Sequence, residues 1–397
     1  MRSIPVALAL LAGLTPWALR AATLQVGPGQ PYAKPCAAVL AASHGDTIEV
    51  DAAGSYDGDV CTWTKNGLTL RGVNGRPHID AAGQHAQGKA IWVIAGNDTT
   101  IENVEMSGCT VPDGNGAAIR QEGTNLTLRG VYFHHNQNGI LTSANAASTI
   151  TIEHSEFAYN GTGTGYTHNI YIGRVGRFVF RNSWSHHASV GHLIKSRAIR
   201  SDILYSRLTG ESGASASYEL SFPNGGLVFV IGSLIQQPSS SQNGAMLDYL
   251  SEGAGSNSDH RLFVVNNTFV NARSTGTFLK IHDGVSQPPL ARNNIFHGAG
   301  TLSSNAATVL DHNYAGSAAL FVDPSQYDYR LLPTAAAVID AGAAPGSGAG
   351  ESLQPVRHYV HPAAGAPRPV AGAIDIGAYE YDASGVFLDG FESAGGR

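Results

Sequence analysis

The chain has 397 residues and a net charge of -6, so it can bury a large core and has no excess of positive charge for binding nucleic acid. Hydrophobic residues make up 43% of the sequence, which excludes a disordered chain. Only 14% of the residues are charged and 48 are glycine, a composition that argues against a helical protein.

The first 22 residues predict an export signal. Arg2 supplies the positive start, an apolar run extends from Ile4 to Leu14, and cleavage is expected near Ala21 or Ala22. A membrane anchor is the weaker alternative, because this run is too short to cross a bilayer. We therefore expect an exported protein (extracellular, periplasmic or at the cell surface) that is a monomer without stable membrane insertion.

Three cysteines follow the signal. In an oxidising compartment, Cys36 and Cys61 predict a disulfide across the first structural turn, and Cys109 is left without a partner. The sequence has no Cys-x-x-Cys pair, so zinc is not expected.

Residues 34–43 predict the one short amphipathic helix, and "DTIEVD" (residues 46–51) predicts a strand. An alternating strand followed by Asn, Gly or Ser and a second apolar step then recurs ten times, at steps of about 20 to 35 residues. The corresponding apolar positions are expected at Leu70, Ile101, Leu128, Ile152, Phe180, Leu204, Val230, Val265, Ala291 and Leu310.

A repeat this short cannot bury its own apolar face, so the copies must stack on one another. The pattern predicts an all-β solenoid of parallel strands over residues 23–330, with Asn and Gly at its corners and the helix over the open first coil. We expect residues 331–382 to close the solenoid or pack on it as an extended segment, and residues 383–397 to form a tail. A sandwich or propeller is the weaker alternative.

The helix and the ten coils closely resemble the right-handed parallel β-helix superfamily, which has the pectate-lyase-like fold. The segment "GAIDIGAYEYD" (residues 372–382) resembles the closing segment of many secreted bacterial β-helix proteins, and "VFLDGFESAGGR" resembles their C-terminal tags. This resemblance implies a right-handed parallel β-helix with an N-terminal capping helix.

Basic residues and histidines gather in the middle of the chain. Between Arg174 and Arg207 there are seven basic residues and one acid, Asp202, and seven of the 16 histidines fall between His134 and His192. Equivalent positions of stacked coils form columns, so we expect a basic column that binds an extended acidic polysaccharide. A solvated basic flank is the alternative.

The densest part is "GYTHNIYIG" (residues 165–173), "VGHLIKSRA" (190–198), "ASYELSFPNGG" (216–226) and "GAMLDYLSEG" (244–253). Because strand side chains alternate between faces, the four segments predict three columns. The predicted inward column is Tyr171, Ile194, Leu220 and Leu247; the outward column is Ile172, Lys195, Ser221 and Asp248; the entry column is Asn169, His192 and Tyr218. A slip of one residue would bury Lys195.

This cluster predicts β-elimination on a uronate-containing polymer, which needs a group that neutralises the carboxylate, a base and an acid. Lys195 can be the base if cations such as Arg197 and Arg200 favour its neutral amine. The candidate acids are His192, His168 and Tyr218. The candidates for holding the carboxylate are Arg197, Arg200 and Asn169, and further substrate contacts are expected at Tyr171, Glu219 and Asp248.

The segment "HLIKSRA" resembles the Lys-Ser step that carries the base in the chondroitinase-B and alginate-lyase group, which implies Lys195 as the base. Where that group has an arginine acid on the next coil, this sequence has Ser221 and Phe222. Where it has calcium-binding glutamates before the lysine, this sequence has Gly191 and His192. We therefore expect no cofactor, since calcium has no evident ligand cluster.

Alternatives remain open from the sequence. A hydrolase or epimerase on the same fold would use Glu219 and Asp248 as its carboxylate pair, and a non-catalytic protein would only bind or adhere. Glu219 pairing with Lys195 or Arg197 is as good an interpretation as a catalytic role. Asp248, Tyr249 and Glu252 either line the groove or cap a turn. A metal site made of His186, His187 and His192 is a weak alternative.

Overall fold

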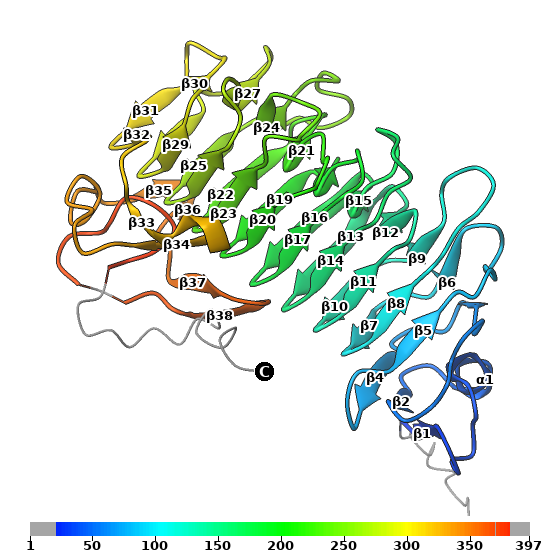
Figure 1. The fold of residues 1–397 in the computed structure, drawn as a ribbon. Helices are drawn as coiled ribbons and strands as arrows, with labels where there is room; N and C mark the ends of the chain where they lie inside the picture. The colour runs from blue at the N-terminus through cyan, green and yellow to red at the C-terminus, as the bar shows by residue number, and fades with distance from the viewer. Residues whose placement is uncertain (1–20, 370, 382–397) are drawn as a thin grey trace, which may run out of the picture.

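The structure is a computed structural model that describes residues 21–369 and 371–381. Parallel strands stack into three long sheets, named A, B and C, and each full coil adds one strand to each sheet (Figure 1). The predicted all-β solenoid is thereby confirmed. The predicted export signal falls almost wholly outside the described residues, and among the helices that are described none is long and apolar enough to cross a membrane.

The strand bounds are as follows. Sheet A contains β1 (Thr23–Val26), β2 (Thr47–Asp51), β4 (Thr69–Val73), β7 (Thr99–Glu102), β10 (Leu126–Arg129), β13 (Asn145–Glu153), β16 (Val175–Arg181), β19 (Arg200–Leu204), β22 (Leu227–Ile231), β25 (Leu262–Val265), β28 (Leu290–Arg292) and β31 (Val309–Asp311). Sheet B contains β3 (Cys61–Trp63), β6 (Ala90–Ile94), β9 (Ala117–Gln121), β12 (Asn138–Thr142), β15 (Ile170–Ile172), β18 (Ile194–Ser196), β21 (Leu220–Phe222), β24 (Ala245–Tyr249), β27 (Thr277–Ile281) and β30 (Thr301–Ser303). Sheet C contains β5 (His78–Asp80), β8 (Glu105–Ser107), β11 (Tyr132–His134), β14 (Glu156–Ala158), β17 (Trp184–His186), β20 (Arg207–Thr209), β23 (Leu234–Gln237), β26 (Thr268–Asn271), β29 (Ile295–Gly298) and β32 (Tyr314–Gly316).

The apolar column predicted along sheet A is present, with two positions wrong by one residue. Ile203 pairs with Phe180 and Val230, and Val264 pairs with Val230 and Ala291, so they replace the predicted Leu204 and Val265. Leu204 and Val265 point outward instead. On that outer side they belong to an apolar cluster that includes Leu353 of the C-terminal segment, which shields them from water.

A left-handed backbone conformation closes the corner after every sheet A strand from β4 to β31. The corner residues are Asn74, Asn103, Gly130, His154, Asn182, Tyr205, Gly232, Asn266, Asn293 and His312. Most are Asn or Gly, which tolerate positive φ and so confirm the expected corners. Asn also bonds neighbouring coils: Asn103 Nδ2 donates to the Gly72 carbonyl at 3.1 Å.

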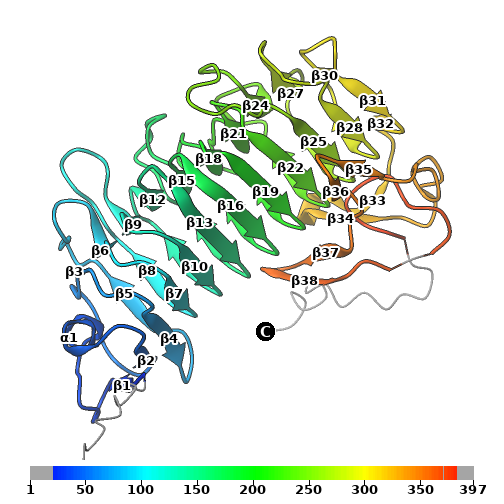
Figure 2. The same cartoon turned by 180° about the vertical axis from the view of Figure 1, so that it is seen from behind.

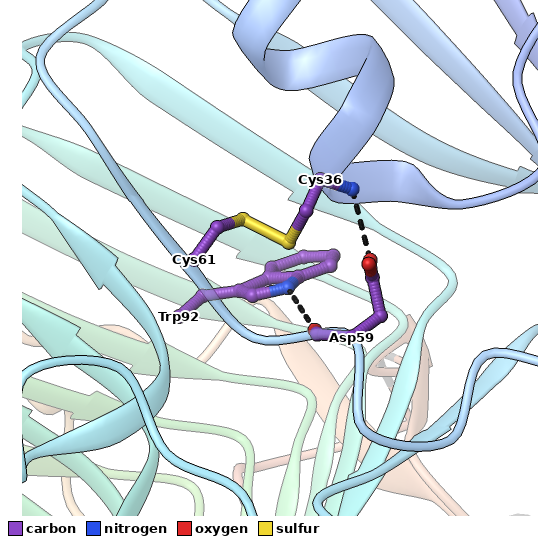
Figure 3. Close-up of a disulfide and its surroundings, with 4 residues drawn as sticks. All are labelled: Cys36, Asp59, Cys61 and Trp92. Carbon is purple, nitrogen blue, oxygen red and sulfur yellow. Dashed lines mark hydrogen bonds between the residues drawn. A yellow bond between two sulfur atoms is a disulfide. The ribbon is translucent and has the colours of Figure 1, made fainter.

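The N-terminal end of the stack holds the helix α1 (Pro35–Ala41), which lies within the predicted range and contacts β1, β2 and β3. That this helix caps the first coil stays a prediction. The predicted disulfide between Cys36 and Cys61 is confirmed (Figure 3). Asp59 ties the same region together, because its carboxylate accepts from Cys36 N at 2.8 Å and its carbonyl from Trp92 Nε1 at 3.3 Å. Cys109 is free and buried.

After β32 the chain returns along the outside of the stack, in orange to red in Figures 1 and 2. Its elements are β33 (Phe321–Asp323), the 3-10 helix η1 (Pro324–Gln326), β34 (Asp328–Leu331), β35 (Ser347–Gly348), β36 (Glu351–Ser352), β37 (Arg357–Val360) and β38 (Ala364–Pro367). Leu353 packs on Phe229 of sheet A, and Tyr359 belongs to a cluster with Leu234 of sheet C. Among the described residues, neither cluster includes a residue of sheet B.

Residues 372–381 close this return around a buried ion pair. Arg368 Nε donates to Glu380 Oε2 at 3.0 Å, and its two terminal nitrogens reach the carbonyls of four residues of the segment. Asp375 accepts from the backbone N–H of Asp340 at 2.6 Å. The acidic residues of this segment therefore hold the chain's last described turns in place.

Candidate functional site

The site predicted around Lys195 lies on the outer face of sheet B. Lys195 in β18 pairs with Tyr171 in β15 and Ser221 in β21, and the column continues through Asp248 and Lys280. The outward placement of Lys195, Ser221 and Asp248 is confirmed.

The predicted alignment of β15 is wrong by one residue. Tyr171 faces outward beside Lys195, whereas Ile172 is fully buried and pairs with Ser196. The reason is the alternation of strand side chains: Ile170 and Ile172 both fill the core, which leaves the residue between them outside. The correction brings a tyrosine into the site.

Lys195 and Arg197 share a carboxylate. The distance from Lys195 Nζ to Glu252 Oε1 is 3.2 Å, and that from an Arg197 terminal nitrogen to Glu252 Oε2 is 2.7 Å. Arg197 Nε also donates to the Tyr171 hydroxyl at 3.0 Å, and Asn224 Oδ1 accepts from the same guanidinium. We call Tyr171, Lys195, Arg197 and Glu252 the sheet B trough.

Glu252 is 46% exposed, in a turn after β24, whereas Lys195 is 15% exposed. The Lys195 side chain is therefore more deeply buried than the Glu252 side chain with which it pairs. From this turn Glu252 contacts both cations of the trough, while Tyr249 is a core residue whose hydroxyl donates to the Gly226 carbonyl at 2.6 Å.

The entry column consists of His168, His192 and Tyr218. His168 takes the place of the predicted Asn169, one residue further along the chain. The rings of His168 and His192 lie 4.6 Å apart, those of His192 and Tyr218 lie 5.0 Å apart, and the backbone N–H of His192 donates to His168 Nδ1 at 3.0 Å. Asn169 points into the interior instead, where its amide donates to the His186 carbonyl at 2.8 Å. It cannot hold a substrate carboxylate from there.

Both histidines of this column are neutral near pH 7. Burial lowers the pKa of His192 to about 3, and the charge of Lys195 lowers it further. Burial also lowers the pKa of His168 well below its ordinary value, with added contributions from His192, Lys195 and Arg197. The positive charge of the site therefore comes from Lys195 and Arg197.

Glu219 and Arg200 lie away from the trough, contrary to expectation. Glu219 is fully buried inside the stack, where Gln237 Nε2 donates to it at 3.2 Å and burial raises its pKa well above the ordinary value. Arg200 belongs to sheet A, where it donates to Asp202 at 2.9 Å and to Glu351. Neither the Glu219–Lys195 pairing nor a Glu219–Asp248 carboxylate pair on one surface is formed.

Asp248 lies on the outward column and is almost fully buried. Its Oδ2 accepts from Ser221 Oγ at 3.4 Å and from Ser251, and its Oδ1 lies 3.4 Å from His282 Nε2. These neighbours fix the carboxylate two strands beyond Lys195.

A groove of about 550 Å³ adjoins the trough on the side of the earlier coils. Arg120, Arg174 and Arg197 line it together with Tyr171 and the exposed Tyr166. Guanidinium groups form bidentate hydrogen bonds with carboxylates, and aromatic rings offer flat apolar surfaces for contact. This lining suits an extended, negatively charged chain.

No protein-family model matches the chain, and no curated protein does. Among solved structures, the crystal structure of pectate lyase Pel9A is similar, with a TM-score of 0.63 and 17% identity over 91% of this chain and 96% of that one. A pectin methylesterase from Aspergillus niger overlaps less, with a TM-score of 0.40 and 16% identity over 59% of this chain and 86% of that one, too weak a likeness to add to the comparison. The chain thus has the right-handed parallel β-helix fold that is called pectate-lyase-like.

Proposed function

We propose that the protein is an exported lyase that cleaves a uronate-containing polysaccharide by β-elimination in the sheet B trough. The observation that carries this proposal is the position of Glu252, whose two oxygens are bound by Lys195 and Arg197 at 3.2 and 2.7 Å. A carboxylate therefore fits between the two cations, and a uronate carboxylate has the same shape and charge.

In the proposed complex the uronate carboxylate takes the place of Glu252 on Arg197. Pairing with the guanidinium withdraws charge from the carboxylate and makes the neighbouring C–H bond more acidic. Lys195, released from Glu252, acts as the base and accepts that proton on its amine. The C–H electron pair forms the new double bond as the glycosidic C–O bond breaks.

The leaving oxygen needs a proton donor. We assign this role to Tyr171, because it lies directly across from Lys195 and Arg197 Nε donates to its hydroxyl at 3.0 Å. A donor to a phenolic oxygen stabilises the phenolate that remains once the proton has moved. Tyr218, which contacts His192, is the second candidate.

The fold and the sequence support the substrate class and the location. A β-helix presents a long flat face along its axis, and the fold likeness is to a pectate lyase. The positively charged start and apolar run of the first 22 residues support export.

The test is an assay on a panel of uronate polymers with two readouts. Ultraviolet absorbance follows the unsaturated ends that elimination creates, and a separate assay follows reducing ends. A lyase raises both. Reducing ends alone would indicate a hydrolase, and retained binding with neither product would indicate an adhesive protein; either outcome overturns the proposal.

A further inference from the structure

Sheet C, on a different face from the trough, brings together three metal-ligating side chains. His78, Glu105 and His134 come from the successive coils of β5, β8 and β11. One ligand atom of each lies within 4.8 Å of those of the other two. Glu105 Oε1 is 3.0 Å from His134 Nε2 and 3.9 Å from His78 Nε2. We call these three residues the sheet C triad.

We propose that the sheet C triad binds a transition-metal ion of the zinc class. Two imidazoles and one carboxylate are a common ligand set for such ions, with metal–ligand distances of about 2.0 to 2.2 Å. A tetrahedral ion at those distances separates its ligands by about 3.4 Å. The two measured separations to Glu105 lie on either side of this value, so a small rotation of the exposed His78 ring completes the site.

A hydrogen bond orients one of the ligands. His134 Nδ1 lies 2.7 Å from His135 Nδ1, so its other nitrogen is directed at Glu105. A partner on the nitrogen that does not bind the ion fixes the tautomer and ring plane of a metal-bound histidine. Ser107 Oγ, which donates to Asp80 Oδ2 at 2.7 Å, lies 2.8 Å from His78 Nε2, so binding of the ion replaces that contact. His78 is 42% exposed, which leaves the fourth position of a tetrahedral ion open to water.

The same arrangement recurs two coils further on, with one ligand exchanged. Tyr132, Glu156 and His186 occupy the positions of His78, Glu105 and His134 in β11, β14 and β17. His186 Nε2 lies 3.0 Å from Glu156 Oε1, and His186 Nδ1 lies 2.6 Å from His187 Nδ1. A tyrosine hydroxyl stands where the triad has its second imidazole, and a phenol is not among the usual zinc ligands. The chain therefore carries its own matched control with two ligands in place of three.

The residues of this site are separated by whole coils in the sequence and lie outside the basic segment, so the sequence pattern does not bring them together. The expectation of no zinc rests on the lack of a Cys-x-x-Cys pair, which a site made of histidine and carboxylate does not need, and the expectation of no calcium rests on the lack of an evident ligand cluster.

The test uses full-length protein purified without a histidine tag and stripped with a chelator. Zn²⁺ and Co²⁺ are titrated by calorimetry, and Co²⁺ is also followed by its visible absorption. We expect one ion per chain, a higher thermal unfolding midpoint with Zn²⁺, and loss of both effects in His78→Gln and in Glu105→Gln. His135→Asn, which keeps a residue that tolerates positive φ, should weaken binding by about 10- to 100-fold.

His186→Gln is the control and should bind the ion as the parent protein does. The exposed position of His78 keeps its variant folded, which circular dichroism checks. Binding that is absent, or that is lost equally in His186→Gln, would overturn the proposal. Lys195→Ala should bind the ion normally, so the test is independent of the proposed lyase activity.

Discussion

Lys195 and Glu252 form an ion pair between residues 57 positions apart, with 3.2 Å between Nζ and Oε1. The partner oxygen of Glu252 binds Arg197 at 2.7 Å. The protein therefore places one of its own carboxylates where the proposed substrate carboxylate would bind.

Removing this internal carboxylate should favour substrate binding. In Glu252→Gln the uronate carboxylate no longer has to displace the Glu252 carboxylate from Lys195 and Arg197. An exposed ion pair of this kind stabilises a protein by about 0.2 to 1 kcal/mol. We expect the KM for an oligouronate to fall by about 1.5- to 5-fold. Initial rates across substrate concentrations measure this. Glu102→Gln, which loses a pair with Arg129 on sheet A, is the control and should leave KM unchanged. A KM that stays constant or rises in Glu252→Gln contradicts the displacement.

The base is tested by comparing two lysines of one column. Lys195→Ala should lower kcat by about 10²- to 10⁴-fold, the usual contribution of a positioned proton acceptor. Lys280 lies on the same outward column beyond Asp248, and Lys280→Ala should retain turnover. Both variants should give the circular dichroism spectrum of the parent. Substantial activity in Lys195→Ala would show that another group is the base.

Buried histidines should make the protein sensitive to acid. Burial lowers the folded-state pKa of His192 to about 3, whereas the unfolded imidazole titrates near 6.5. Between these values the unfolded chain binds more protons, so the contribution is fully present above pH 6.5 and is lost as pH falls towards 3. The loss is about 1.4 kcal/mol per pH unit for a single histidine.

Urea unfolding at several pH values measures this effect. The free energy of unfolding of His192→Gln should depend less on pH than that of the parent, and the difference isolates this residue. Glu156 acts in the opposite direction, because burial raises its pKa to about 7, but it is present in both proteins. Parallel curves for the two proteins would contradict the buried neutral imidazole.

The disulfide should stabilise the N-terminal coils. Cys36 and Cys61 are 25 positions apart, and closing a loop of that length contributes about 3.5 kcal/mol. In the double variant Cys36→Ala/Cys61→Ala, amide exchange should accelerate in β1, β2 and β3 and stay unchanged in β24 and β27, since coils of a solenoid contact only their neighbours.

Thiol chemistry gives a second readout. Burial raises the pKa of Cys109 to about 12, so only Cys36 and Cys61 should react with a thiol reagent after reduction of the folded protein. Cys109→Ala is the control and should keep the exchange pattern of the parent in β1 to β3. Uniform acceleration across all coils in the double variant would contradict a local effect.

The period of the repeat predicted the sheets, because apolar residues that recur once per coil have to stack on one another. Which residues of each strand face the core was harder to predict from the sequence. Leu204 and Val265 are as apolar as the neighbours that fill the core, and only the C-terminal segment explains why they lie outside. In β15 the predicted alignment places Tyr171 on the inner face, although the two isoleucines that flank it indicate that it points outward.

The candidate site was predictable where it follows strand order and not where it depends on turns. Lys195 and Asp248 share a column because they hold equivalent strand positions. Glu252 reaches Lys195 from a turn two coils further on, at a position that strand alternation does not fix. Glu219 has the residue type of a catalytic group, but it lies in a bend just before β21 and is fully buried in the core.

The return of the C-terminal segment over the earlier coils has a consequence for biogenesis. Phe229 and Val265 are synthesised well before Leu353, the residue that covers them. Until the ribosome has synthesised the C-terminal segment, the nascent solenoid exposes an apolar surface on sheet A that can associate with other chains. Premature termination before Leu353 should therefore yield aggregates even though every coil is complete.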